Sequence, residues 1–384
     1  MKTARRYIAS EIYRSTIAVT LVLVGLFMFF DMIDNLDNVN ERFTFSALIG
    51  MQILQIPTRL YDLLPISLLI GAIIALAGLA QRNELVVLRV SGISSRNLLG
   101  MLWITTIPMM VFAFLLSEGL TPYAESKTGQ INLQLLGKSS GARMNSGYWF
   151  REPAGEAGEL RFINIANISS ESEVENIRIY NFDADGHFKE LLLADKGSFQ
   201  DDQLELFNLQ QIRTEFDLET ALSNPDALQE PLSTQQRLES YTIDTSLSQE
   251  RLLASELQPD RMSIVGLLDY IQYLDENHLQ SNRQVVALWR KGVYPFTLLV
   301  MITLAAPISF MQTRKGGAGL KIFGGILIGV VFFMINQLAL NLGMLNNLPP
   351  WLTALAPNTI ALLIASFALY MIERKNRPNS KAHA

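Results

Sequence analysis

The chain alternates between long apolar runs without charges and polar stretches, and the largest polar stretch lies in its middle. Runs of roughly 20 apolar residues, at a rise of 1.5 Å per residue, cross a hydrocarbon core of about 30 Å. Pro349 and Pro350 interrupt the last run, which therefore predicts two helices. The uncharged runs are Ser15–Phe30, Leu63–Gln81, Asn97–Ser117, Gly292–Thr313 and Ile322–Ile372. The pattern predicts six transmembrane helices, three on each side of the polar middle.

From Tyr148 the polar middle changes to short alternations of apolar and polar residues with turn residues between them. A period of two is typical of β-strands, and short strands at regular spacing indicate an antiparallel fold. The clearest alternations are 160–165, 174–182, 188–193, 203–209 and 212–216. We therefore expect a membrane α-helical protein with an inserted all-β, jelly-roll-like domain. Asp183–Gly186 is interpreted as a hairpin turn rather than a calcium loop.

The predicted organisation has five parts. They are transmembrane helices 1–3 with a short helix at 82–92 (1–120), a β-domain with flanking helical linkers (121–262), a connecting helix (263–290), transmembrane helices 4–6 (291–375) and a tail (376–384). Apolar residues at helical spacing after Ser263 predict the connecting helix, with Ser263 at its N-cap.

The distribution of charge orients the chain in a membrane. The N-terminus, the turns after the second and fourth spans and the C-terminal tail hold 14 Lys and Arg residues against 3 acidic ones, out of totals of 31 and 36. The positive-inside rule places this basic set in the cytoplasm. We expect a bacterial inner-membrane protein with both termini cytoplasmic and the β-domain in the periplasm.

Composition argues against several function classes. The chain has no cysteine and three histidines, so it lacks disulfides and the usual ligands of zinc. Motifs of phosphate-binding loops, metalloproteases and serine hydrolases are absent from the sequence. The uncharged runs contain no Asp, Glu, Lys or Arg, whereas ion-coupled transporters need charged residues near the midplane. We expect no enzyme, no bound cofactor, and a supply of energy from another protein.

Three polar features allow alternative interpretations. The segment from Arg82 to Gly92 predicts a short amphipathic helix, which either docks a partner protein or lies on lipid headgroups. Asn336, Gln337 and Asn341 lie in the fifth span and either join helices or line a transport path. A third feature, the acidic series Asp31, Asp34, Asp37 and Glu41, is either a solvated helix face or a site for cations or a basic partner.

The stretch from Leu64-Pro65 through Gly71 to Gln81-Arg82-Asn83-Glu84 and Ser91-Gly92 resembles the LptF/LptG permeases of the lipopolysaccharide export ABC transporter, in its LptG form. Leu257–Asp260, Trp289–Lys291 and the turn at 346–350 support the resemblance, which covers essentially the whole chain. It implies a permease subunit that extracts lipopolysaccharide from the inner membrane and passes it to a periplasmic bridge protein. The alternative is a non-transporting subunit that relays ATPase motion to a periplasmic partner.

The resemblance also implies partners and sites. The partners are an LptF-like second permease, a dimeric LptB-like cytoplasmic ATPase that binds ATP and Mg²⁺, an LptC-like bitopic protein and lipopolysaccharide. The implied ATPase-coupling residues are Arg82, Glu84, Leu85, Val87, Leu88, Ser91 and Gly92. Lipopolysaccharide would enter between spans 1 and 5 of opposite subunits, past Leu26, Phe30, Lys127, Phe162, Asn336, Gln337 and Asn341.

One departure from the family concerns the lipid headgroup. Some relatives carry lysines just after span 1, where this chain has Asp31, Asp34 and Asp37. Arg and Lys are the side chains that contact phosphate best. The headgroup site therefore differs, uses divalent cations or belongs to the partner subunit.

Overall fold

The computed structural model describes residues 2–39, 44–90, 95–136, 148–154, 158–168, 173–200, 203–214, 233–247, 258–277, 279–307, 318–345 and 348–376. The chain forms two compact units. The first comprises Met1–Glu125, Pro259–Leu268 and Ser281–Ala384, and the second comprises Ser126–Gln258 and Asp269–Gln280.

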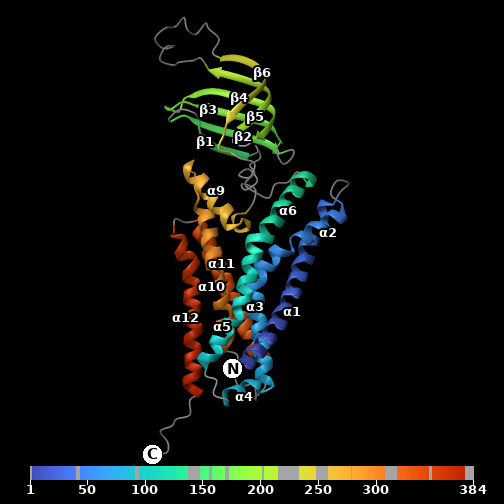
Figure 1. Ribbon diagram of the computed structural model, residues 1–384, viewed down its shortest axis with the longest axis vertical. Helices are drawn as coiled ribbons and strands as arrows, with labels where there is room; N and C mark the ends of the chain where they lie inside the picture. Colours follow the sequence, from blue (N-terminus) through green and yellow to red (C-terminus); the bar gives the residue numbers. More distant parts are fainter. Residues whose placement is uncertain are drawn as a thin grey trace, which may run out of the picture. The chain divides into compact units, whose positions relative to one another are not determined.

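Six helices of the described chain are long and apolar enough to span a membrane, which confirms the predicted number. They are α1 (Lys2–Asp34), α3 (Ile56–Gln81), α5 (Ser95–Leu115) with its continuation α6 (Thr121–Leu136), α10 (Asn282–Ala305), α11 (Ala318–Leu345) and α12 (Pro350–Asn376) (Figure 1). A π-helical turn, η2 (Leu116–Leu120), joins α5 to α6. Shorter elements are η1 (Leu36–Asn38), α2 (Phe45–Leu54), α4 (Glu84–Val90), η4 (Pro259–Arg261) and α9 (Ile264–Glu276).

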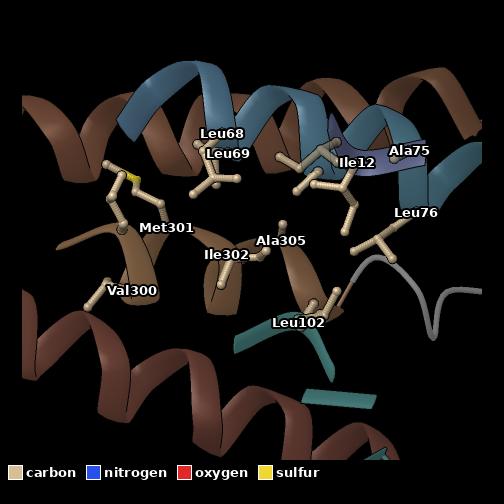
Figure 2. Close-up of a cluster of buried hydrophobic side chains, with 14 of the residues drawn as sticks. Ile12, Leu68, Leu69, Ala75, Leu76, Leu102, Val300, Met301, Ile302 and Ala305 are labelled. Carbon is tan, nitrogen blue, oxygen red and sulfur yellow. The ribbon is translucent and has the colours of Figure 1, made fainter. Parts of the chain in front are cut away.

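Helix α3 is the centre of the helical unit. Within its most apolar window 78% of the residues are buried, against 17% for α1 and 22% for α11 and α12. Leu68, Leu69 and Leu76 of α3 are fully buried and belong to one apolar cluster with Met301 and Ile302 of α10 (Figure 2). The apolar faces of α1, α11 and α12 therefore remain available to lipid or to another subunit.

A glycine sets the closest contact between α1 and α3. A Cβ atom on Gly71 would lie 2.5 Å from the Cα atom of Thr16, far inside van der Waals contact. The absence of a side chain at Gly71 thus lets α1 lie against the backbone of α3. Gly78 on the same helix faces open space.

The second unit contains one six-stranded antiparallel sheet. Its strands are β1 (Tyr148–Pro153), β2 (Leu160–Ile168), β3 (Glu173–Phe182), β4 (Phe188–Gln200), β5 (Gln203–Thr214) and β6 (Ser233–Asp244). Strands adjacent in the chain are neighbours in the sheet, so these six strands form a meander (Figure 1). The inserted antiparallel β-domain is confirmed. The connections among its described strands lack the Greek-key crossovers of a double-sheet jelly roll.

One face of the sheet is apolar through its middle and polar at one end. Phe150, Ile163, Ile179, Leu192 and Leu206 are among the buried side chains of the apolar region. At the end of this face, five side chains on successive strands pair in register across the sheet and form what we name the polar row. The polar row consists of Glu152, Arg161, Asn181, Glu190 and Arg213.

The turn between β3 and β4 is the predicted hairpin. The carboxylate of Asp183 accepts hydrogen bonds from the backbone N–H groups of Asp185 (3.0 Å) and His187 (2.8 Å). Gly186 has a φ of +85°, a backbone conformation that favours glycine. These contacts explain the turn by local backbone chemistry.

Candidate functional site

The short helix α4 is fixed to α1 by a polar cluster. Asn83, with a φ of 59°, turns the chain sharply between α3 and α4. Arg82 pairs with Glu11 and with Glu84, each at 3.2 Å, and the Tyr7 hydroxyl donates to the Glu84 carboxylate at 2.8 Å. The side-chain hydrogen bond with Glu11 is the largest contribution that raises the pKa of Arg82. Arg82 and Glu84 therefore orient α4.

The apolar residues of α4 divide between two roles. Leu85 is 3% exposed and belongs to the core of the helical bundle, so it anchors the helix. Val87 is 65% exposed, and Val86 and Val90 are exposed beside it. We name these three residues the α4 valine patch. Sequence periodicity did not single out Val86 and Val90, because seven residues are too few to show which face the bundle covers.

The remaining predicted coupling residues are Leu88, Ser91 and Gly92. Leu88 lies within α4, but its side chain is outside the described set. Ser91 and Gly92 lie outside the described residues altogether. Their roles stay predictions.

The three amides of the fifth span occupy different environments. Asn336 is buried and accepts a hydrogen bond from Asn358 of α12 at 3.2 Å. Gln337 is half-buried, and Asn341 is exposed among Met334, Leu338 and Leu345. Asn336 therefore joins α11 to α12, whereas Asn341 presents a polar group on an apolar surface.

The predicted path residues of span 1 lie on the exposed face of α1. Leu26 and Phe30 are both exposed, together with Phe27 and Phe29. Helix α1 packs on α3 and α5, and α11 packs on α3, α10 and α12. Each of the two helices thus packs on α3 and keeps an exposed apolar face.

The acidic series after span 1 is partly explained by an ion pair. Asp31 of α1 pairs with Arg59 of α3. Asp34 and Asp37 are exposed, and Glu41 lies outside the described residues. At Asp31 the acidic side chain therefore has a structural partner within the chain.

The two predicted path residues of the second unit lie on different elements, α6 and β2. Lys127 is half-buried on α6. Phe162 lies on β2 on the face opposite to Ile163 and Ile165, and its ring packs edge-to-face on Phe182 with centroids 5.7 Å apart. The structure therefore places Phe162 outside the apolar interior of the sheet.

The spanning helices also carry ionisable residues that the uncharged runs did not include. The helices extend past those runs and bring Asp62, Glu118, Arg290 and Lys291 into one group near Asp260 and Arg261. These charges lie at helix ends, outside the uncharged runs, and pair with one another. Only the Trp289–Lys291 and Leu257–Asp260 segments had pointed to this region.

An apolar groove lies between α11 and α12 in the helical unit. Its volume is about 500 Å³, and Ile328, Phe332, Ile335, Leu352 and Ile360 are among its lining residues. Such a lining suits hydrocarbon rather than a polar solute.

Six spanning helices with α3 buried among them, an exposed short helix at a turn and an inserted β-domain define a multi-spanning membrane permease subunit. The chain belongs to the family described as lipopolysaccharide export system permease LptF/LptG, whose pattern matches residues 6–371. It is therefore a permease of the lipopolysaccharide export system and an inner-membrane multi-pass protein rather than an enzyme.

Curated relatives match over nearly their full length. The lipopolysaccharide export system permease protein LptG of Haemophilus influenzae is 26% identical over 376 residues, which cover 98% of this chain and 99% of the relative. LptG of Escherichia coli K12 is 26% identical over 373 residues, or 97% and 98% of the two chains. The similarity thus includes the helices, the β-domain and α4.

Proposed function

We propose that the chain is the LptG-type subunit of an ABC transporter that extracts lipopolysaccharide from the inner membrane and hands it to a periplasmic bridge. The observation that carries this proposal is the match to LptG proteins across both halves of the bundle and the inserted domain. The subunit would pair with an LptF-like permease and an LptC-like bitopic partner, and a dimeric LptB-like ATPase would bind ATP and Mg²⁺.

The ATPase would dock on the α4 valine patch. Exposed apolar residues on a short helix suit insertion into a partner's groove. The Arg82–Glu84 cluster would hold α4 rigid, so that a displacement imposed on α4 reaches α1 and α3.

Lipopolysaccharide would enter between α1 of one subunit and α11 of the other. Leu26 and Phe30 would contact acyl chains, and Gln337 and Asn341 would contact polar groups of the lipid. In the β-domain the apolar face around Phe150 and Ile163 suits acyl chains. Photo-crosslinkers at Phe30 and Phe150 should capture lipopolysaccharide, and Phe162 on the opposite face serves as the comparison.

Both termini and α4 would lie in the cytoplasm and the β-domain in the periplasm. The charge distribution supports this orientation. Because the chain has no cysteine, single cysteines introduced at exposed Asp185 and Arg96 would report their own sides to an impermeant thiol reagent. We expect labelling at Asp185 in intact spheroplasts and at Arg96 after lysis.

The test of function is affinity purification of the chain from native membranes, followed by reconstitution. We expect a second six-span permease, a small soluble ATPase and lipopolysaccharide to co-purify, and ATP to drive lipopolysaccharide release from proteoliposomes. Recovery with a periplasmic hydrolase and without lipopolysaccharide would favour a subunit that relays ATPase motion.

A further inference from the structure

The chain re-enters the helical unit through residues 259–264, which we name the return segment. It comprises the 3-10 helix η4 and the start of α9. Ser263 is the N-cap of α9, as predicted: its hydroxyl accepts a hydrogen bond from the Gly266 N–H at 3.1 Å. Two charged residues, Asp260 and Arg261, lie in the segment.

Arg261 joins the return segment to two spanning helices. Its guanidinium lies 2.7 Å from the Asp62 carboxylate of α3 and 3.8 Å from the Glu125 carboxylate of α6. Burial disfavours the charged form of Arg261, but the carboxylates of Asp62, Glu125 and Asp260 outweigh this effect and raise its pKa. Arg261 and Asp62 thus form an ion pair in a largely buried position.

Asp260 and Glu118 join the segment to α10 and to the π-helical turn. Asp260 pairs with Arg290 at 2.7 Å. Lys291, whose side chain is 4% exposed, donates to the Ser117 hydroxyl at 2.6 Å and to the Glu118 carboxylate at 3.1 Å. The second oxygen of Glu118 accepts the Ile264 N–H at 2.7 Å. Glu118 therefore bridges a buried lysine and the first turn of α9.

The π-helical turn makes this bridge possible. Its wider winding places the consecutive residues Ser117 and Glu118 against the same ammonium group. Such turns occur often at functional positions within long helices. Breaking one partner of a buried ion pair leaves an uncompensated charge.

Helix α3 links this network to the opposite end of the bundle. Asp62 lies in its second turn, and at its other end Arg82 and Asn83 lead directly into α4. Near Asp62, the ring of Tyr61 stacks on Tyr294 of α10 with centroids 4.3 Å apart, and the Tyr294 hydroxyl donates to the Tyr61 carbonyl at 2.6 Å. The continuous, buried α3 has fixed contacts at both ends.

We propose that Asp62, Glu118, Asp260, Arg261 and Lys291 form a clamp through which α3 moves the return segment when α4 is displaced. This inference rests on the proposed function, since it assigns the clamp to coupling between ATP hydrolysis and lipopolysaccharide release. The five residues are positioning residues and do not contact the lipid. If the five residues had only a structural role, their substitution would change the stability of the chain and leave coupling intact.

The test uses the reconstituted complex with Asp62→Asn or Glu118→Gln. We expect ATP hydrolysis to stay near the wild-type rate. The amount of lipopolysaccharide released per ATP should fall at least about fivefold, which is the smallest effect commonly found for coupling between two sites. Asp62→Glu, which keeps the carboxylate, should retain coupling. The matched control is Asp31→Asn, which breaks an ion pair with Arg59 one turn from Asp62 without touching the return segment.

A second measurement is independent of the cargo. Spin labels on cysteines at exposed Leu120 and Val265 report the distance from the π-helical turn to α9. In the wild type we expect a narrow distribution of distances between the labels that shifts with ATP and vanadate. In Glu118→Gln we expect a broad distribution of distances that does not respond to these ligands. If Glu118→Gln does not accumulate in the membrane, Arg261→Lys replaces it in the same comparison with the wild type.

The outcomes separate the two proposals. If the wild-type complex releases no lipopolysaccharide, the proposed function fails, and the spin-label distances alone decide on the clamp. Release and hydrolysis that fall in parallel, or distances that respond to ATP equally in wild type and Glu118→Gln, would overturn the clamp.

Discussion

Asp31 on α1 and Arg59 on α3 form an ion pair directly beyond the exposed apolar face of α1. The pair accounts for an acidic residue where some relatives carry a lysine. Both side chains are about three-quarters covered, with exposed fractions of 24% and 28%. We infer that Asp31 holds α1 to α3.

The first prediction concerns this pair. Asp31→Lys should lower the stability of the purified chain by about 1 kcal/mol, because it places two cations together. The exchange Asp31→Arg with Arg59→Asp should restore most of the loss. Thermal unfolding in detergent measures both. Asp31→Asn should leave lipopolysaccharide release unchanged, and a strong loss of release would point to a cation site at Asp31 instead.

The second prediction concerns the contact between α1 and α3. Gly71→Ala should destabilise the chain by about 1–3 kcal/mol, because the new methyl group overlaps Thr16. Gly78→Ala on the same helix meets open space and should be neutral or slightly stabilising, since alanine favours a helix. Thermal unfolding of the two variants provides the comparison, and equal effects would contradict the close approach.

The third prediction separates the two roles of amides on α11. Asn358→Leu removes the hydrogen bond to Asn336 and should lower stability by about 0.6 kcal/mol or more. Asn341→Leu should leave stability unchanged because Asn341 is exposed, but should reduce lipopolysaccharide crosslinking at Phe30. A stability loss in Asn341→Leu as large as that in Asn358→Leu would show that the distinction is wrong.

The fourth prediction concerns α4. Val87→Asp should abolish co-purification of the ATPase while the chain accumulates normally, because Val87 is exposed. Leu85→Asp buries an unpaired charge in the bundle and should lower the amount of folded chain. The two variants are distinguished by the amount of ATPase that co-purifies, divided by the amount of the chain present in the membrane. Retention of the ATPase by Val87→Asp would remove the valine patch as its docking surface.

The fifth prediction concerns acid sensitivity of the polar row. Burial of Glu190 disfavours its charge, but hydrogen bonds from Gln211 (2.7 Å), Asn181 (2.8 Å) and Arg213 (3.1 Å) outweigh this and lower the pKa of its carboxyl. The folded-state pKa lies below the unfolded value of about 4.3. The stabilisation is therefore present above that value and is lost as pH falls through the folded pKa.

Glu190→Gln should accordingly lower Tm at neutral pH, and the difference from wild type should close under acid. Thermal unfolding across the pH range measures this difference. Asp185→Asn, at the exposed hairpin, is the control and should leave Tm unchanged. A difference that persists undiminished at low pH would argue against an ionised Glu190 as its source.

Much of the fold could be predicted, because the spacing of apolar residues along the chain indicates directly whether a segment is a helix or a strand. The alternation at 174–182 corresponds to β3, and the run Leu63–Gln81 lies within α3. Strand β6 was not predicted, because its side chains are mostly polar and exposed and show no apolar alternation.

The candidate sites were less predictable, because they depend on pairs distant in the chain. Glu118 and Lys291 lie 173 positions apart, so neither neighbourhood reveals that they meet. Phe162 and Ile163 are adjacent apolar residues on opposite faces, and one step in register decides which faces the interior. The burial of Leu85 likewise depends on the packing of α4 against the bundle, which the sequence of α4 alone does not show.

The burial of α3 also constrains how the protein is made. Helix α3 emerges early from the ribosome, but α10 and α11, which cover it, follow only after the β-domain. At typical synthesis rates the stretch 82–281 takes about 10 to 40 s. During that time the first three helices lack α10 and α11, so the surface of α3 that these two helices cover stays exposed. Biogenesis of this permease therefore passes through a half-assembled intermediate, which membrane-insertion chaperones are suited to shield.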